Sequence, residues 1–320
     1  MNDVAVIGAG AWGTALAVQA ARAGRTVALW ARDSARAADM QARRRTPRLP
    51  GIVLADAITV VDRLPRAGVT LVAVPLQHMR GVAADLPGSG PLAVCAKGVE
   101  TASLRLPLEV LADVLPNRAA AVLTGPNFAH EIAAGLPAAA VVAATAEPIR
   151  AEIIAAMASG GFRLYGNDDP IGAQIGGAAK NVVAIAAGVV VGAGLGENAR
   201  AALVTRGLAE IARLAAALGG RAETVAGLSG LGDLLLTCTG TASRNFSLGL
   251  ELGRGRDLAD ILAGRSDVTE GVATAPALVA RAAASGVTLP IGAAVAAVMQ
   301  GRLTVLEAVA ALMGRPLRDE

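Results

Sequence analysis

The chain has 320 residues, which is enough for two domains at roughly 100–200 residues each. Apolar residues make up 54% of it and charged residues 17%, a composition that supports a large core and excludes extended disorder. The 29 basic and 26 acidic residues leave a net charge of +3, too small an excess for a nucleic-acid-binding protein.

The chain is apolar on average, which raises the question of membrane insertion. Two of its uncharged apolar runs, residues 181–196 and 132–146, are shorter than the ~18–20 apolar residues of a spanning helix, and each contains Gly or Pro. The N-terminus has neither a basic n-region nor a cleavage site, so we predict a cytoplasmic protein without membrane insertion. Cys95 and Cys238 lie far apart without metal-ligand spacing, so neither a disulfide nor a metal site is predicted.

The first half of the chain alternates short β-branched runs with helical patterns, which is typical of a parallel sheet with crossover helices. Continuous apolar runs such as residues 71–74 suit strands that are covered on both faces. The expected strands are residues 4–7, 26–30, 58–60, 70–74, 92–96 and 121–123, and the runs 138–143 and 162–165 are candidates to extend the sheet.

The sequence GAGAWG at residues 8–13 follows the first strand and opens a helical pattern. In this fingerprint Gly8 permits the tight turn, Gly10 lets the backbone approach a pyrophosphate, and Gly13 allows close packing of helix on strand. Free N–H groups at the helix N-terminus then bind phosphate. The strand, turn and helix in this order predict a dinucleotide site.

The residues after the second strand bear on the choice of dinucleotide. Asp33 lies about 20 residues beyond the last glycine, where an acid would bond the ribose 2′-OH of NAD. Arg32 would instead pair with the 2′-phosphate of NADP. We favour NADP(H), with NAD(H) as the alternative. Five more arginines add charge nearby, most of them interpreted as solvated surface: Arg36, Arg43, Arg44, Arg45 and Arg48.

The character of the sequence changes at residues 167–170. Asp169 before Pro170 is typical of a helix start, with the acid as N-cap and the proline in the first helical position. Strand patterns end there, and helices are expected over 170–187 and 198–218, followed by shorter ones. We therefore predict a Rossmann-type doubly wound α/β domain, residues 1–168, followed by an all-α substrate domain, residues 169–320.

Two further features of the second half concern its helices. A capping box formed by Thr304 and Glu307 predicts the start of the last helix, which Gly314 ends. The abundance of Ala and Gly predicts helices that approach closely through small residues.

Only two of the 29 basic residues are lysines, Lys97 and Lys180. In a chain that otherwise uses Arg, a remaining lysine suggests a need for a titratable amine or a compact charge. Lys180 lies in a long apolar helix, where desolvation would suit it to giving a proton to a carbonyl oxygen; the alternative is a snorkelling surface lysine. Lys97 ends the fifth strand, where ligands bind in doubly wound sheets, or is a plain loop cation.

Ser243, Arg244 and Asn245 precede an apolar helical pattern. Ser243 as N-cap, free backbone N–H groups and the Arg244 guanidinium would make an anion pocket. Capping alone explains Ser243, but a cation is unfavourable at the positive end of a helix, so it does not explain Arg244. Asp233 in a constrained turn either orients Lys180 or caps the helix that follows it.

These segments together resemble the bacterial-type NAD(P)-dependent sn-glycerol-3-phosphate dehydrogenases. The combination is far more specific than a Rossmann fingerprint, and it spans essentially the whole chain in family order. The matching stretches are GAGAWGTALA (8–17), LWARD (29–33), AKGVE (96–100), TGPNFAHEI (124–132), GGAAKNVVAIAAG (176–188), TRGLAEI (205–211), GLSGLGDLLLTC (227–238), SRNFSLG (243–249) and VTEGVATA (268–275).

The resemblance implies roles for individual residues. Lys180 resembles the family's proton donor and acceptor, and it also counts among the substrate contacts. The other implied substrate contacts are Lys97, Gly125, Asn127, Asp233, Ser243, Arg244 and Asn245. The implied cofactor contacts, besides the three glycines, are Ala11, Trp12, Arg32, Lys97, Ala129, Arg244, Val268 and Glu270. The chain departs from the family pattern at Ala11, Leu76 and Asn127, where the family commonly has Ser, Ser, and Ser or Thr.

Members of this family reduce dihydroxyacetone phosphate to sn-glycerol 3-phosphate for glycerophospholipid synthesis. The resemblance therefore implies an oxidoreductase with a small phosphate substrate, acting as a homodimer. One alternative is another reductase of the same two-domain architecture, which would recognise a carboxylate and would not need the Ser243–Asn245 pocket. A second is a non-catalytic NADPH-sensing module, which would have no reason to keep Lys180 in an apolar setting.

Overall fold

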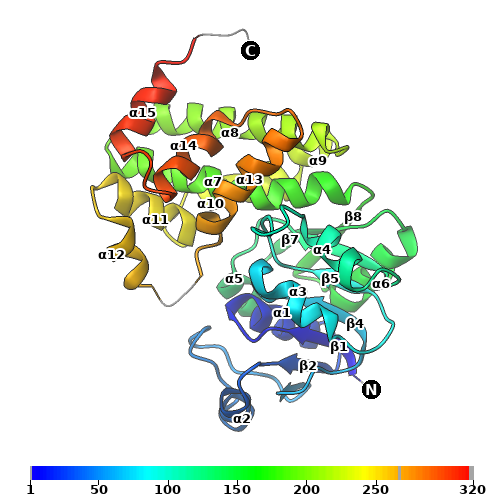
Figure 1. The fold of residues 1–320 in the computed structure, drawn as a ribbon. Helices are drawn as coiled ribbons and strands as arrows, with labels where there is room; N and C mark the ends of the chain where they lie inside the picture. Colours follow the sequence, from blue (N-terminus) through cyan, green and yellow to red (C-terminus); the bar gives the residue numbers. More distant parts are fainter. Residues whose placement is uncertain (1, 266–267, 317–320) are drawn as a thin grey trace. The chain divides into compact units, whose positions relative to one another are not determined.

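The computed structural model describes residues 2–265 and 268–316 (Figure 1). The chain forms two compact units. The first consists of Met1–Lys97 and Leu106–Ala173, and the second of Gly98–Arg105 and Gln174–Glu320. The short segment Gly98–Arg105 thus belongs to the helical unit, although the preceding strand, which ends at Val94, belongs to the other one.

The first unit is built on an eight-stranded sheet in the order β3-β2-β1-β4-β5-β6-β7-β8. All the expected strands are present, with ends that differ by a few residues. This order, with its crossovers on both sides of β1, confirms the doubly wound α/β fold. The strands are β1 (Asn2–Ile7), β2 (Val27–Trp30), β3 (Ile58–Val61), β4 (Ala67–Val72), β5 (Leu92–Val94), β6 (Ala120–Thr124), β7 (Ala138–Ala143) and β8 (Phe162–Asn167).

Helices cover both faces of this sheet, which explains the continuous apolar strands. In β1, Val4 and Val6 face one core cluster, whereas Ala5 and Ile7 face another. The first cluster includes residues of α1, α2, α5 and α6, and the second includes residues of α3 and α4. These helices are α1 (Ala11–Arg22), α2 (Ser34–Arg43), α3 (Leu76–Ala84), α4 (Pro107–Val114), α5 (Ala129–Ala134) and α6 (Glu147–Met157).

One strand pair departs from the expected parallel sheet. β6 and β7 are antiparallel, with Val122 opposite Ala143 and Thr124 opposite Val141. The helix between them, α5, has 6 residues and so is about 9 Å long at 1.5 Å per residue. A strand of this size spans about 17–20 Å, so α5 alone does not return the chain to the starting edge of the sheet.

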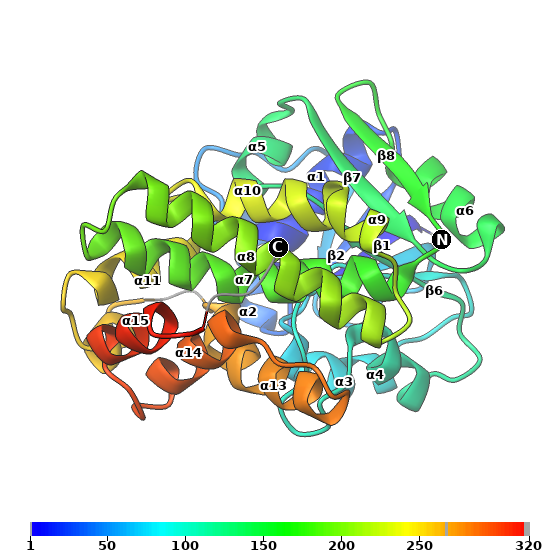
Figure 2. The same ribbon diagram turned by 90° about the horizontal axis from the view of Figure 1, so that it is seen from above.

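The second unit is helical, and every regular element described after Asn167 is a helix (Figure 2). This confirms the helical character expected of the C-terminal part. Its elements are α7 (Pro170–Gly192), α8 (Glu197–Ala217), α9 (Ala222–Ala226), the π-helical turn η1 (Leu228–Gly232), α10 (Asp233–Cys238), α11 (Arg244–Gly253), α12 (Leu258–Ala263), α13 (Glu270–Ala284), α14 (Pro290–Met299) and α15 (Val305–Met313).

The helix-start signals read from the sequence are present. A carboxylate oxygen of Asp169 accepts a hydrogen bond from the Gly172 N–H at 2.8 Å, as an N-cap does. At the start of α15, Thr304 Oγ1 accepts from the Glu307 N–H at 3.2 Å, and the Glu307 carboxylate accepts from the Thr304 N–H at 2.8 Å. The capping box is therefore confirmed.

The expected close approach of helices occurs between α7 and α11. A Cβ atom added at Gly188 of α7 would overlap the backbone of Phe246, and one added at Gly249 of α11 would overlap the backbone of Ile185. The two helices therefore meet backbone to backbone, which only glycine permits at these positions.

Helix α7 is longer than the sequence predicted. At 23 residues it is long and apolar enough, by length and composition, to cross a membrane, which the uncharged runs alone did not indicate. However, 83% of its most apolar window is buried inside the protein. A core helix has this character, because its apolar faces are covered by neighbouring helices.

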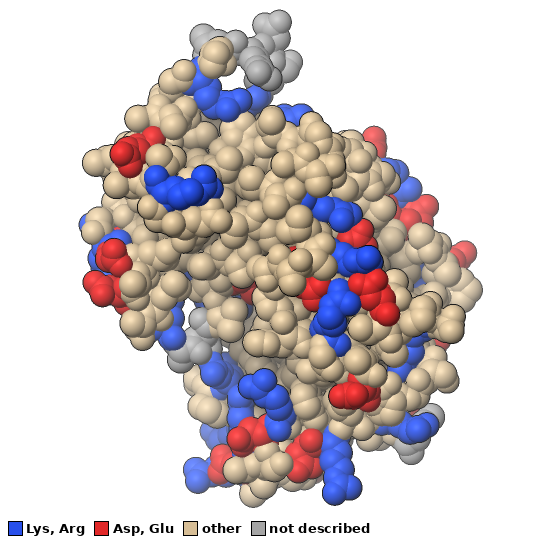
Figure 3. Space-filling view, in the orientation of Figure 1, with Lys and Arg blue, Asp and Glu red and all other residues tan. Residues whose placement is uncertain are grey.

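Charged side chains of both signs are interspersed on the face seen in Figure 3. This agrees with the nearly balanced composition of 29 basic and 26 acidic residues.

Candidate functional site

The glycine-rich turn joins β1 to α1 in the first unit. Gly8 has φ +115°, and a Cβ there would lie 3.0 Å from the Ala73 carbonyl oxygen. A Cβ at Gly13 would overlap the Gly8 carbonyl, so this glycine allows α1 to pack on the turn. The protein's own packing thus explains the first and third glycines.

Gly10 is different, because a Cβ at this position would meet nothing within 4 Å. Gly10 is the N-cap of α1 and has no side chain to satisfy the first N–H groups of the helix, and the first turn contains no acid. Open space beside free N–H donors fits the pyrophosphate of a dinucleotide. The residues present therefore fit the cofactor that the fingerprint predicts.

The carboxylate of Asp33 has a structural task. Asp33 is the N-cap of α2, and its Oδ1 accepts a hydrogen bond from the Arg36 N–H at 2.7 Å. The residue that directly follows β2 is Ala31, which is 3% exposed and carries no polar group, and Arg32 after it is exposed. Neither Ala31 nor Arg32 has a carboxylate, and that of Asp33 caps α2, so these three residues do not favour the hydrogen bond to the ribose hydroxyls that is typical of NAD sites.

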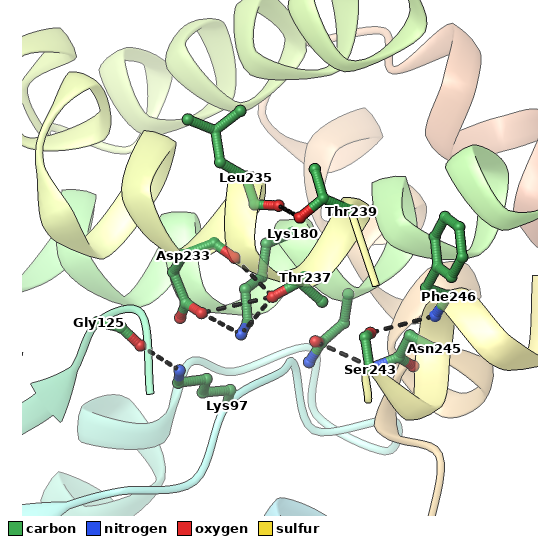
Figure 4. A network of polar contacts seen from close by, with 11 residues as sticks. Lys97, Gly125, Lys180, Asp233, Leu235, Thr237, Thr239, Ser243, Asn245 and Phe246 are labelled. Carbon is green, nitrogen blue, oxygen red and sulfur yellow. Dashed lines mark hydrogen bonds and ion pairs between the residues drawn. The ribbon is translucent and has the colours of Figure 1, made fainter. Parts of the chain in front are cut away.

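Lys97 and Gly125 follow the adjacent strands β5 and β6. Lys97 Nζ donates a hydrogen bond to the Gly125 carbonyl at 3.3 Å (Figure 4). Nearby in sequence, Thr124 Oγ1 and Asn127 Oδ1 are buried and have no hydrogen-bond partner among the described residues. Because buried polar atoms are normally paired, two such atoms beside a lysine indicate room for a polar ligand.

Trp12 and Ala129 stand at the starts of α1 and α5. Both are partly buried and pack on the same core cluster. Ala11 packs there as well.

In the second unit, Lys180 of α7 points at one face of α10. Its side chain is 10% exposed and forms an ion pair with Oδ1 of Asp233, which is itself 1% exposed (Figure 4). Lys180 Nζ also donates to Thr237 Oγ1 at 3.0 Å, and Thr237 Oγ1 in turn donates to the Asp233 carbonyl at 2.5 Å. A carboxylate this close favours the ammonium form of the lysine.

The local sequence explains this arrangement. Asp233 and Thr237 are four residues apart in one helix, so they share a face. Gly176 lies one turn before Lys180, and a Cβ there would be 2.6 Å from the Ser229 carbonyl oxygen. The missing side chain lets η1 pack against α7, and α10 begins immediately after η1.

Cys238 is also buried beside this cluster. Burial raises the pKa of its thiol to about 12, although the Lys180 charge acts in the opposite direction. The thiol is therefore neutral at physiological pH and is not a candidate nucleophile.

The next residue of α7, Asn181, belongs to a second buried network. Asn245 Nδ2 donates to Asn181 Oδ1 at 3.0 Å, and Asn245 Oδ1 accepts from the Gly271 N–H at 3.0 Å. A Cβ at Gly271 would lie 2.6 Å from Asn245 Oδ1. The Asn245 carboxamide thus holds α7, α11 and the start of α13 together.

Ser243 is the N-cap of α11, as predicted, and its Oγ accepts from the Phe246 N–H at 3.2 Å. Arg244 is exposed in the first helical position. The first turn of α11 contains no acid to offset this cation. The conflict between a cation and the positive helix end, noted in the sequence, is therefore present in the structure.

Val268 and Glu270 flank the start of α13. Val268 is 52% exposed, and Glu270 begins the helix. Between them, the Thr269 hydroxyl is buried without a hydrogen-bond partner among the described residues.

Proteins of one family match this chain over most of its length. Sequence profiles of the NAD-dependent glycerol-3-phosphate dehydrogenase N-terminus and C-terminus match residues 3–149 and 169–310. A glycerol-3-phosphate dehydrogenase (NAD(P)+) of Acidiphilium cryptum strain JF-5 is 63% identical over 255 residues, 79% of each chain. That of Gluconobacter oxydans strain 621H is 51% identical over 266 residues, 81% of each chain. The crystal structure of glycerol-3-phosphate dehydrogenase from Coxiella burnetii has a TM-score of 0.93 and 36% identity, over 98% of this chain and 99% of that one.

The chain belongs to the NAD-dependent glycerol-3-phosphate dehydrogenase family.

This membership confirms the predicted enzyme class, an NAD(P)-dependent oxidoreductase. Two polar residues close to Lys180 in this dehydrogenase, Thr237 and Asn181, were not predicted as site residues from the sequence. Thr237 could have been found from its spacing of four from Asp233 on a predicted helix, and Asn181 from its place next to the lysine. Both were passed over because nothing in the sequence indicates which helix faces them.

Proposed function

We propose that this protein reduces the ketone of dihydroxyacetone phosphate to the secondary alcohol of sn-glycerol 3-phosphate, with NAD(P)H as the reductant. Its role would then be to supply sn-glycerol 3-phosphate for glycerophospholipid synthesis. The observation that carries the proposal is the buried contact of Lys180 with Asp233 and Thr237, in a family named for this reaction.

The cofactor would be held by the glycine-rich turn of the first unit. Gly8, Gly10 and Gly13, with Ala11 and Trp12, would take the pyrophosphate end, and open space at Gly10 supports this. When bound, the dihydronicotinamide supplies the hydride to the carbonyl carbon. The further contacts that we propose on the strength of the family resemblance are Arg32, Lys97, Ala129, Arg244, Val268 and Glu270.

Lys180 would hold the proton that the reaction consumes. As an ammonium it would donate to the carbonyl oxygen while that oxygen gains negative charge, and in the reverse direction the neutral amine would accept the proton. Asp233 and Thr237 fix the position of Nζ and favour its charged form. For Asp233 we therefore propose the orienting role, which the sequence left open against simple capping.

The substrate phosphate would bind at the start of α11. The helix N-terminus and the exposed Arg244 guanidinium both favour an anion there, and a dianion would remove the unfavourable placement of that cation. Ser243 and Asn245 would hold the start of α11 in place for this phosphate, Ser243 by capping the helix and Asn245 by its hydrogen bonds to Asn181 and Gly271. In the first unit, Lys97, Gly125 and Asn127 are proposed as further substrate contacts, supported by the unpaired Asn127 Oδ1.

We also propose a functional boundary at residue 168, a homodimer, and a cytoplasmic location, as the resemblance and the sequence imply. A reductase acting on a carboxylate substrate is disfavoured by the family membership. A non-catalytic sensor is disfavoured by the buried Lys180 cluster.

The direct test is oxidation of NADPH, followed by its near-ultraviolet absorbance, with dihydroxyacetone phosphate as substrate. Unphosphorylated dihydroxyacetone, a 2-ketoacid and NADH are run in parallel. Turnover that requires the phosphate would support both the reaction and the anion site. Tight NADPH binding without turnover of any carbonyl compound would overturn the substrate assignment.

A further inference from the structure

The arginines that follow β2 do not all lie on solvated surface. Arg43 at the end of α2 is of the expected kind: its side chain is 76% exposed, and its Nε contacts Asp39 at 2.6 Å on the same helix. Arg44 ends α2 at φ 55° and donates to the Ile58 carbonyl at 2.8 Å, which is a structural role. Arg36 and Arg48 of this group are only partly exposed.

Arg36 reaches from α2 to the glycine-rich turn. Its Nη2 donates to the Ala9 carbonyl at 2.6 Å, between Gly8 and Gly10. Its Nε is buried and has no hydrogen-bond partner among the described residues. A half-buried guanidinium with an unused donor is held beside the turn that fits a pyrophosphate.

Arg48 adds a second positive charge, near enough to act on Arg36. Its backbone N–H donates to Thr46 Oγ1 at 3.3 Å, and the neighbouring Thr46 and Leu49 are both buried, which anchors this part of the loop. Burial lowers the pKa of Arg36, and the nearby charge of Arg48 lowers it further. Asp33 acts in the opposite direction, yet its effect is the smallest of the three.

Two guanidinium groups close together are mutually unfavourable, and partial burial increases the cost. An anion between them would reverse the sign of this interaction. In a doubly wound fold, the groups near the end of the second strand face the adenosine ribose of the dinucleotide. At that position the chain has Ala31, and the Asp33 carboxylate is committed to the N-terminus of α2.

We propose that Arg36 and Arg48 form a subsite for the 2′-phosphate of NADP(H), which makes the protein discriminate against NAD(H). This inference rests on the proposed function, because it concerns the same dinucleotide site. A 2′-phosphate carries the oxygens that guanidinium donors bind best, and Arg36 Nε supplies a donor that has no partner among the described residues.

The test is a binding titration that needs no turnover. The chain has two tryptophans, Trp12 in the glycine-rich turn and Trp30 at the end of β2, so intrinsic fluorescence reports on this site. NADPH, NADH and adenosine 2′,5′-bisphosphate are titrated into the wild type, Arg36→Ala, Arg48→Ala and the double variant. Arg43→Ala is the matched control, since it removes the same charge from the same helix.

Loss of one charged hydrogen-bonding partner should weaken NADPH and the bisphosphate by roughly tenfold to a hundredfold in Kd. NADH should change by less than about threefold in Arg48→Ala, and Arg43→Ala should leave all three ligands unchanged. Arg48→Ala is the more informative single variant, because Arg36 also supports the turn through Ala9 and its removal could disturb the fold.

Equal weakening of NADPH and NADH in Arg48→Ala, or no effect on either, would overturn the subsite. A wild type that binds neither dinucleotide would overturn the proposed function, and the subsite with it. The two failures are therefore distinguishable from the wild-type titrations alone.

Discussion

Gly176 and Ser229 approach so closely that a methyl group at residue 176 would lie 2.6 Å from the Ser229 carbonyl oxygen. This contact between α7 and η1 is one turn from Lys180 on one side and four residues from Asp233 on the other. The absence of a side chain at Gly176 thus determines how near the acid and the lysine can come.

Gly176→Ala should separate η1 from α7. We expect a loss of about 1–3 kcal/mol in the free energy of unfolding, as for other overpacked cores, together with reduced kcat. Urea unfolding and steady-state kinetics measure the two effects. Gly81→Ala in α3 is the control, because a Cβ there meets nothing within 4 Å, and its stability should hold or rise. Unchanged stability and kcat in Gly176→Ala would contradict this account.

Lys180→Ala should abolish most of the turnover. Removal of a general acid typically costs roughly 10²- to 10⁴-fold in rate, while NADPH binding should remain within a few-fold of the wild type. The variant leaves the Asp233 carboxylate buried without its cation, which would destabilise the fold by itself. The double variant Lys180→Met with Asp233→Asn therefore serves as a second, better balanced test. Wild-type kcat in either variant would exclude the proton-transfer role.

Thr237→Val should lower kcat by about tenfold, because a methyl group replaces the hydroxyl that accepts from Lys180 Nζ at 3.0 Å. Thr237→Ser keeps the hydroxyl and should retain most of the activity. A merely structural hydroxyl would instead affect thermal stability in Thr237→Val without a difference in kcat, so both quantities are measured for both variants.

Arg244→Ala should chiefly raise the KM for dihydroxyacetone phosphate, by about tenfold to a hundredfold, with a smaller effect on kcat. Inorganic phosphate as a competitive inhibitor should lose affinity in parallel. Arg254→Ala, which removes an exposed arginine just beyond the other end of α11, is the matched control. A lowered kcat at unchanged KM would place Arg244 at the reacting atoms rather than at the phosphate.

Glu210 predicts a dependence of stability on pH. Burial raises the pKa of this carboxyl above its ordinary value of 4.5, although it accepts hydrogen bonds from Ile291 N at 2.7 Å and Gly292 N at 3.2 Å. The folded state therefore binds the proton more tightly than the unfolded state. The contribution of Glu210 to the free energy of unfolding should be greatest below pH 4.5. It should fall as the pH rises through the raised pKa of the folded state.

Glu210→Gln removes the titrating group. Thermal unfolding at a series of pH values should show a flatter profile just above pH 4.5 for the variant than for the wild type. Parallel profiles would show that Glu210 does not contribute to the pH dependence.

Much of this molecule could be predicted from local sequence. The eight strands follow from β-branched runs, and the starts of α7 and α15 from Asp169 and Thr304, because capping depends only on nearby residues. The antiparallel strand β7 could not be predicted, since strand direction depends on how far α5 carries the chain and not on the strand's own residues.

Some residues of the candidate site could likewise be predicted from local sequence, and others could not. Lys180 was identifiable from the rarity of lysine, and Ser243 from its position before an apolar helix. The arginine run that includes Arg36 was interpreted mostly as solvated surface, because the sequence does not reveal that the Arg36 guanidinium contacts the Ala9 carbonyl, 27 residues away in the chain. Contacts between elements distant in the chain, such as Asn181 with Asn245, depend on the helix packing and have no local signal.

The backbone contact of α7 with α11 has a consequence for how this protein could change its substrate. α7 carries Lys180, and α11 begins with Arg244. Because main-chain atoms meet at Gly188 and Gly249, the spacing between these helices is not adjustable by exchanging one side chain for a slightly larger one. With the roles proposed for Lys180 and Arg244, the carbon-chain length between the reacting carbonyl and the anionic group is set by the backbone itself. On these proposals, evolution towards a longer substrate would require rebuilding a helix pair, whereas a change of cofactor would need only the exchange of Arg36 and Arg48.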